Sequence, residues 1–183
     1  MTNTVEGMPE AFGGGTIAPG NSKPFAVGVG EGAAYWFDRS LWIVLTSPER
    51  TGSMHAAFDV TVSPGAGAAA HAHTKQDEAF FVLEGRATFA IEADGTNRTI
   101  EAGPGDLVHV PRGVVHSFAV PDNAPVRFLN YYAPCGFEPF IENVGTSAER
   151  RGLPPDDLPE PDPNRMKEWA KRTGLEMDPG TVG

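Results

Sequence analysis

The sequence predicts an all-β fold of antiparallel strands, arranged as a barrel or a sandwich, for this chain of 183 residues. Short runs of β-branched and aromatic residues recur between residues 33 and 132, and no long helical period interrupts them. Turn-forming residues separate the runs, and the 22 glycines and 17 prolines are many for this length. Together these observations favour short strands joined by tight turns in one domain.

Eight strands are expected in this region, because turn signals such as Pro64-Gly65 and Asp94-Gly95 separate the runs. The expected strands are Ala34–Phe37, Leu41–Thr46, Ala57–Val62, Ala79–Leu83, Ala87–Ile91, Leu107–Val110, Ser117–Val120 and Val126–Tyr131. Ahead of them, residues 1–30 carry turn formers without periodicity and are expected to form a loosely ordered N-terminal arm. The barrel itself is expected to span residues 31–135.

Two short helices are expected in a C-terminal extension over residues 136–183. Thr146 begins a helix-capping box, and Gly152 is placed to end that first helix. Asp162-Pro163 is the expected start of the second helix, which Gly174 ends. The apolar face of the second helix, expected to pack on the barrel or on a second subunit, holds Met166, Trp169 and Ala170.

Charge and cysteine content limit the partners and the compartment. The chain has 14 basic and 24 acidic residues, a net charge of −10, and no run of Lys and Arg. This excludes nucleic acids and anionic membranes as principal partners, because most of the surface would repel a polyanion. The single cysteine, Cys135, cannot form an internal disulfide and is interpreted as an inert residue. The chain shows no secretory signal pattern and no apolar run long enough to span a bilayer, so we expect a cytoplasmic protein.

Three of the five histidines fall into two compact segments, and this placement carries the functional prediction. The first segment reads Gly65-x5-His71-x-His73-x4-Glu78-x6-Gly85, and the second reads Gly105-x5-Pro111-x-Gly113-x2-His116. The other two histidines, His55 and His109, have no spacing that relates them to these segments. Both are therefore expected to be surface or packed residues.

The spacing of the first segment indicates a site on one face of a sheet. His71 and His73 are two residues apart, so on a strand both imidazole rings project from the same face. Glu78 begins the next apolar run, where it shares a face with Phe80 and Val82. An isolated carboxylate among apolar side chains is costly to ionise, and a bound cation removes that cost.

The second segment adds a third imidazole. His116 follows a tight turn and shares a strand face with Phe118 and Val120. Three neutral imidazoles and one carboxylate suit Mn, Fe, Co, Ni, Cu or Zn better than Mg or Ca, which prefer oxygen ligands. Four protein ligands leave one or two coordination positions for a substrate oxygen, water or dioxygen.

The two segments resemble the two motifs of the cupin family, G-x5-H-x-H-x4-E-x6-G and G-x5-P-x-G-x2-H-x3-N, at every position but the last. The final Asn is Val120 here, and that position is not a ligand in the family. The resemblance implies a cupin β-barrel of the jelly-roll type. It implies one divalent metal ion per chain, held by His71, His73, Glu78 and His116. It also implies a homodimer, since single cupins commonly pair barrel to barrel.

Residues 34–37 and 136–146 look like the corresponding stretches of small bacterial quercetinase-like cupins. That resemblance implies quercetin 2,3-dioxygenase chemistry, in which a flavonol hydroxyl oxygen binds the metal, dioxygen attacks the ring and carbon monoxide leaves. Glu78 would then also be the base that deprotonates the substrate hydroxyl. Phe80, Val82 and Phe118 are expected either to line an apolar cavity for a flat aromatic or enol substrate or simply to pack in the core.

Two other functions stay open, because the cupin fold hosts many activities. The same site could serve a non-oxidative cyclase or isomerase of secondary metabolism, in which the metal acts as a Lewis acid. It could also belong to a metal-containing module that binds a small molecule without converting it. The complete ligand set argues against this last function, since non-catalytic cupins often lack one or more ligands.

Overall fold

The computed structural model of the protein describes residues 24–93 and 95–177, so most of the predicted N-terminal arm lies outside the described residues. The strands are β1 (Ala34–Phe37), β2 (Ser40–Val44), β3 (Ala56–Val62), β4 (Gly67–His73), β5 (Asp77–Glu84), β6 (Ala87–Ala93), β7 (Thr96–Ala102), β8 (Leu107–Val110), β9 (His116–Ala119), β10 (Val126–Ala133), β11 (Thr146–Ser147) and β12 (Leu175–Met177). The helices are α1 (Pro48–Thr51), α2 (Glu138–Val144) and α3 (Pro163–Thr173).

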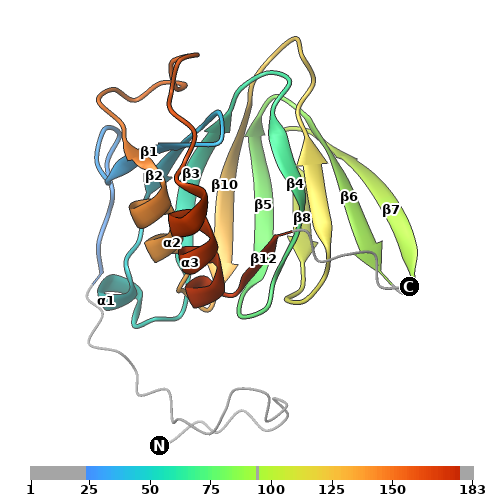
Figure 1. The fold of residues 1–183 in the computed structure, drawn as a ribbon, viewed down its shortest axis with the longest axis horizontal. Coiled ribbons are helices and arrows are strands. Elements are labelled where there is room, and N and C mark those ends of the chain that lie inside the picture. The colour runs from blue at the N-terminus through green and yellow to red at the C-terminus, as the bar shows by residue number, and fades with distance from the viewer. Residues whose placement is uncertain (1–23, 94, 178–183) are drawn as a thin grey trace, which may run out of the picture.

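The strands form two antiparallel sheets, which enclose one apolar core (Figure 1). The seven-stranded sheet has the order β11-β1-β2-β3-β10-β5-β8, and the five-stranded sheet has the order β12-β4-β9-β6-β7. Neighbours far apart in sequence, such as β3 and β10 or β4 and β9, pair because the chain crosses between the sheets. The predicted all-β barrel of antiparallel strands is confirmed.

Alternation along the strands explains the core. In β3 and β10 every second residue is buried, and the inward face of β10 carries Phe128. Phe128, Phe58 and Phe89 are fully buried, and the Phe80 ring lies 5.0 Å from that of Phe89, centroid to centroid. Burying one such side chain contributes about 1.5–3 kcal/mol to folding. This aromatic core holds the strands that carry the site in fixed register.

A glycine of the first histidine segment is required by the turn between β5 and β6. Gly85 has φ of 75°, in the left-handed region, and a Cβ atom there would lie 2.2 Å from the carbonyl oxygen of Pro125. Both the conformation and the close approach exclude a side chain. Gly85 is therefore required by the backbone conformation of the turn, whereas the histidines of the same segment supply ring nitrogens to the polar cluster.

Three strands of the five-stranded sheet, β4, β7 and the short β12, were not among the eight predicted strands. The first half of β4 is Gly67-Ala68-Ala69-Ala70, small residues with low β-propensity, and its pairing with β9 decides its conformation. Strand β7 is exposed at every residue except Ala102 and has no apolar alternation to reveal it. None of the described helices is both long and apolar enough to cross a membrane.

The helix predicted from the capping box at Thr146 is wrong. Thr146 and Ser147 form β11, which pairs with Trp36 and Tyr35 of β1, so hydrogen bonding at a sheet edge prevails over the local pattern. The helix of this region, α2, lies upstream, and Phe140 and Ile141 bury it against the core.

The second predicted helix is confirmed as α3. The Asp162 side chain accepts hydrogen bonds from the first-turn amides, and Gly174 ends the helix in the left-handed conformation. Helices α2 and α3 lie together against one side of the barrel (Figure 1). After Gly174 the chain enters β12, which pairs with β4 so that Leu175 lies opposite His73 and Met177 opposite His71. The C-terminal segment thus borders the strand that carries two histidines.

Candidate metal centre

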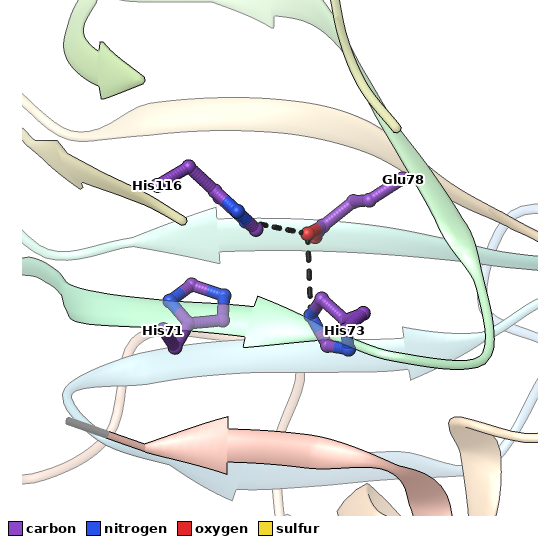
Figure 2. A group of neighbouring side chains, drawn as sticks. All are labelled: His71, His73, Glu78 and His116. Atoms are coloured by element: carbon purple, nitrogen blue, oxygen red, sulfur yellow. Dashed lines mark hydrogen bonds and ion pairs between the residues drawn. The ribbon is translucent and has the colours of Figure 1, made fainter. Parts of the chain in front are cut away.

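The structure brings the four polar residues of the two histidine segments together between the two sheets. His71 and His73 come from β4, and His116 from the neighbouring strand β9, where it lies directly opposite His71. Glu78 reaches the same point from β5 of the other sheet. One ligand atom from each residue lies within 4.8 Å of all the others. Figure 2 shows the four side chains pointing toward one another.

The cluster is buried. His73, Glu78 and His116 are 2–3% exposed, and His71 is half-buried. The Phe137 ring contacts the His73 ring edge-on at 4.9 Å between centroids. A carboxylate in such surroundings needs compensating partners, because burial alone strongly disfavours its charge.

Each oxygen of the Glu78 carboxylate has its own set of partners. Oε2 accepts a hydrogen bond from His116 Nε2 at 2.9 Å and lies 3.3 Å from His73 Nε2. Oε1 accepts hydrogen bonds from the Tyr132 hydroxyl at 2.6 Å and from Asn130 Nδ2 at 3.0 Å. The carboxylate therefore presents one oxygen to the imidazoles and the other to neutral donors of β10.

Backbone carbonyls orient two of the imidazoles. His71 Nδ1 lies 2.8 Å from the carbonyl oxygen of Ala69, and His116 Nδ1 lies 3.0 Å from that of Val114. A carbonyl only accepts, so both Nδ1 atoms carry a proton and both Nε2 atoms are directed to the cluster. His116 also donates from Nε2 to Glu78, so it carries a proton on each ring nitrogen when no ion is bound. Donation by the outer ring nitrogen is the usual support of a metal-ligating histidine.

Burial and mutual charge set the protonation of the cluster. Burial lowers the pKa of His71 to about 4, helped by the nearby His116, so this imidazole is neutral near pH 7. Burial favours a higher pKa for Glu78, but the charge of His73 and the hydrogen bond from His116 outweigh it and hold the pKa well below 4.5. For His116, burial is outweighed by the hydrogen bond to Glu78, and its pKa is raised. Glu78 is therefore ionised.

The residues fit a divalent transition metal ion. Both ring nitrogens of the buried His73 lack a hydrogen-bond partner among the described residues. Its Nε2 is close to Glu78 but not aligned for a hydrogen bond. A buried ring nitrogen normally has a hydrogen-bond partner. A ring nitrogen without one, in a cluster of three imidazoles and one carboxylate, fits the role of a metal ligand. The set is compatible with one divalent metal ion.

A cavity of about 720 Å³ opens beside the cluster. His71, His73 and Glu78 line its inner end, together with the aromatic rings of Phe80 and Phe118. Val82, the third residue expected in this wall, is fully buried in the core and is not among the lining residues. The outer part of the cavity is defined as the lining from segments that flank residues 58–132, and it includes Phe37, Phe140, Pro161, Met166 and Leu175 with the carboxyl side chains of Asp38 and Glu160.

Sequence reasoning missed Asn130 and Tyr132. Both lie on the inward face of β10 with Phe128, and both are about 1% exposed. The signal was present in the alternation, since an asparagine at an inward position of an apolar strand needs a buried partner. Only the pairing of β10 with β5, which sets Tyr132 opposite Glu78, shows what that partner is.

The other sequence candidates lie away from the cluster. His55 stacks on Tyr131 with 4.9 Å between ring centroids, and His109 is an exposed residue of β8. Cys135 is a half-buried free thiol whose pKa is raised by burial. These environments agree with packed and surface roles.

Comparison with known proteins finds a match to one domain family and sequence similarity to several dioxygenases. Residues 58–132 match the cupin domain family. Quercetin 2,3-dioxygenase of Bacillus subtilis (strain 168) is 27% identical over 139 residues, which are 76% of this chain and 40% of that protein. Acireductone dioxygenase of Bacillus thuringiensis subsp. konkukian (strain 97-27) is 44% identical over 63 residues, 34% of this chain and 36% of that protein. The chain thus spans less than half of the length of either relative.

Solved structures agree on the fold. The oxalate decarboxylase of Lactobacillus farciminis, a formate complex, has a TM-score of 0.54 and 20% identity over 64% of this chain and 35% of that chain. A predicted oxalate decarboxylase of Thermotoga maritima has a TM-score of 0.53 and 18% identity over 61% of this chain and 100% of that chain. With the strand order and the two histidine segments, these findings show a cupin fold, a match of residues 58–132 to the cupin domain family, and sequence similarity to quercetin 2,3-dioxygenase.

Proposed function

We propose that the protein is a metal-dependent dioxygenase that acts on a flavonol-like or other aromatic or enol-type small molecule. The observation that carries the proposal is the convergence of three imidazoles and one carboxylate at the inner end of an apolar cavity. The similarity to quercetin 2,3-dioxygenase over 76% of this chain supports the same class of substrate. The shorter similarity to acireductone dioxygenase supports dioxygen as the second reactant.

His71, His73, Glu78 and His116 are the proposed ligands of one divalent ion, which would be Fe, Ni, Co, Mn or Cu, with Zn as a further candidate. When bound, such an ion supplies Lewis acidity and, if redox-active, electrons for oxygen chemistry. We assign Glu78 a second role as the base for the substrate hydroxyl. Its ionised state suits that role, because a base must be deprotonated before it accepts the proton.

The cavity supports a flat, largely apolar substrate. Its volume of about 720 Å³ lies within the range of about 300–1,000 Å³ typical of small-molecule sites. Phe80 and Phe118 border its inner end, and Phe37 and Phe140 border its outer part. Aromatic walls give a planar ring system large contact area and exclude water from the reacting end.

The decisive experiment combines metal analysis with oxygen uptake. Purified protein is analysed for bound metals, and each metal-loaded form is then assayed aerobically with flavonols and enediols. Oxygen consumption that depends on both substrate and metal is the expected result. Zinc-dependent conversion without oxygen would instead identify a cyclase or isomerase. Binding of the compounds with neither oxygen uptake nor conversion would identify a binding module, and both outcomes would overturn the proposal.

A homodimer and a cytoplasmic location remain predictions from the sequence. Light scattering on the eluate of a size-exclusion column would test the first, and fractionation of the cells that make the protein would test the second. The division into an arm, a barrel ending at residue 135 and an extension also remains a prediction. Limited proteolysis would test it, with cleavage expected near residue 30 before any cut within the sheets.

A further inference from the structure

The unequal surroundings of the two Glu78 oxygens carry an inference that rests on the proposed function. A carboxylate oxygen offers two lone pairs, and both on Oε1 are engaged, one by the Tyr132 hydroxyl and one by Asn130 Nδ2. Oε2 faces the imidazoles of His73 and His116. We infer that Tyr132 and Asn130 are positioning residues, which hold Glu78 as a ligand through Oε2 alone.

The two donors are themselves held rigidly. Tyr132 lies directly opposite Glu78 in the pairing of β10 with β5, and Asn130 lies opposite Phe80. The Tyr132 ring stacks on Phe137 with 4.6 Å between centroids. Asn130 Nδ2 also lies 3.3 Å from the carbonyl oxygen of Ala79, on the same strand as Glu78. Neither donor can turn away without breaking contacts inside the core.

This arrangement has a consequence for the coordination sphere. With Oε1 engaged, Glu78 cannot bind a metal ion through both oxygens unless it gives up two buried hydrogen bonds. One-oxygen ligation would take up one coordination position of an ion instead of two, which would leave more positions for a substrate oxygen. The same two hydrogen bonds fix the direction of Oε2, the only oxygen left to take a substrate proton.

The test compares Tyr132→Phe with a matched control, Tyr131→Phe. Tyr131 is the neighbouring residue on β10, but it points outward, is 36% exposed and stacks on His55. Metal affinity is measured by competition with a chelator, and the ligand set is followed in the absorption and electron paramagnetic resonance spectra of the Co(II)-loaded protein. We expect Tyr132→Phe to change the spectrum and weaken metal binding about 10- to 100-fold, the usual effect of losing an outer-shell partner. The control should match the wild type.

A second variant, Asn130→Ala, removes the other donor to Oε1 and keeps the test valid if Tyr132→Phe does not fold. Asn130 and Tyr132 also line the cavity, but the aromatic walls formed by Phe80 and Phe118 are unchanged in both variants. In each variant that turns over, kcat is therefore expected to fall more than KM rises. A wild-type spectrum and wild-type affinity in both variants would overturn the inference and leave the proposed function intact. Failure of the wild-type protein itself to bind any transition metal would instead overturn the proposed function.

Discussion

The cavity has two ends that are built in different ways. The inner end belongs to β4, β5 and β10, strands paired on both sides within the segment that matches the cupin domain, and it carries His73 and Glu78. The outer end is formed largely by segments that precede and follow that match, including Phe37, Met166 and Leu175. The inner end is polar, buried and cross-linked by hydrogen bonds, whereas the outer end is mostly apolar and partly exposed, with the carboxyl groups of Asp38 and Glu160 in its lining.

This difference indicates that the two ends of the cavity have different functions. Strands paired on both sides hold charged groups to within the small tolerance that coordination requires. Side chains on a helix and a short edge strand can change size without disturbing that geometry. We therefore expect changes at the inner end to affect metal binding and changes at the outer end to affect the choice of substrate. The following predictions test that separation.

The largest effect is expected at the inner end from His73→Ala. Loss of a ligand should weaken metal binding by more than about 100-fold, because loss of an outer-shell partner alone costs about 10- to 100-fold. Chelator competition measures the affinity, and oxygen uptake should fall with metal occupancy. His109→Ala is the matched control, since His109 is exposed on β8 and away from the cluster. Equal metal affinity in the two variants would contradict the assignment.

At the outer end, Met166→Ala should change substrate selectivity and leave metal binding unchanged. Met166 lines the cavity from α3, so its truncation removes apolar contact with a substrate. An apolar contact of this size is worth about 1–3 kcal/mol, or about 10- to 200-fold in kcat/KM between substrates that differ there. The comparison is made with Met54→Ala, an exposed methionine that is not among the lining residues. Loss of metal from Met166→Ala would break the separation of the two ends.

Gly174→Ala should disturb the connection between α3 and β12, which packs against the residues that follow β4. A Cβ atom there would lie 2.7 Å from Thr74 Oγ1 and from Lys75 Cγ, and the residue has φ of 81°. We expect a loss of about 1–3 kcal/mol in the free energy of unfolding, measured with urea. Gly95→Ala has a similar φ of 69° but no atom within 4 Å, so it isolates the conformational part. Equal losses would show that the contact with Thr74 and Lys75 is unimportant.

The smallest effect is expected from Asp77→Asn, at the surface above the inner end. Asp77 Oδ1 accepts hydrogen bonds from Arg112 N and Nε, which tie the start of β5 to the turn before His116. Both side chains are more than a third exposed, so the charge pair should contribute at most about 0.5 kcal/mol.

The pH dependence of that contribution follows from the Asp77 pKa. The Arg112 hydrogen bond lowers this pKa below 3.8, so the folded protein binds the proton less readily than the unfolded chain. The stabilisation is therefore fully present above 3.8 and is lost as the pH falls through the folded pKa. Urea unfolding of wild type and variant should differ near pH 7 and converge in acid. A difference that grew in acid would contradict this account.

Much of the inner end could be predicted from the sequence, because its constraints are local. Two residues of spacing place His71 and His73 on one strand face, and β-rich runs with turn signals define most of the barrel strands. The prediction failed where pairing decides conformation. Thr146 has a helix-capping pattern but joins a sheet edge, and β7 has no apolar alternation to mark it.

The sequence by itself determined the fold class and the four residues proposed to bind a metal, since alternation and spacing are properties of neighbouring residues. Tertiary structure alone decided which oxygen of Glu78 faces the imidazoles, because that depends on Tyr132 and Asn130, more than 50 residues away. It also decided that Leu175 and Met166 would face the same cavity as His73. Contacts between strands that are far apart in sequence produce no periodic pattern of residues. Such contacts therefore cannot be predicted from residue spacing and are known only from the pairing of the strands.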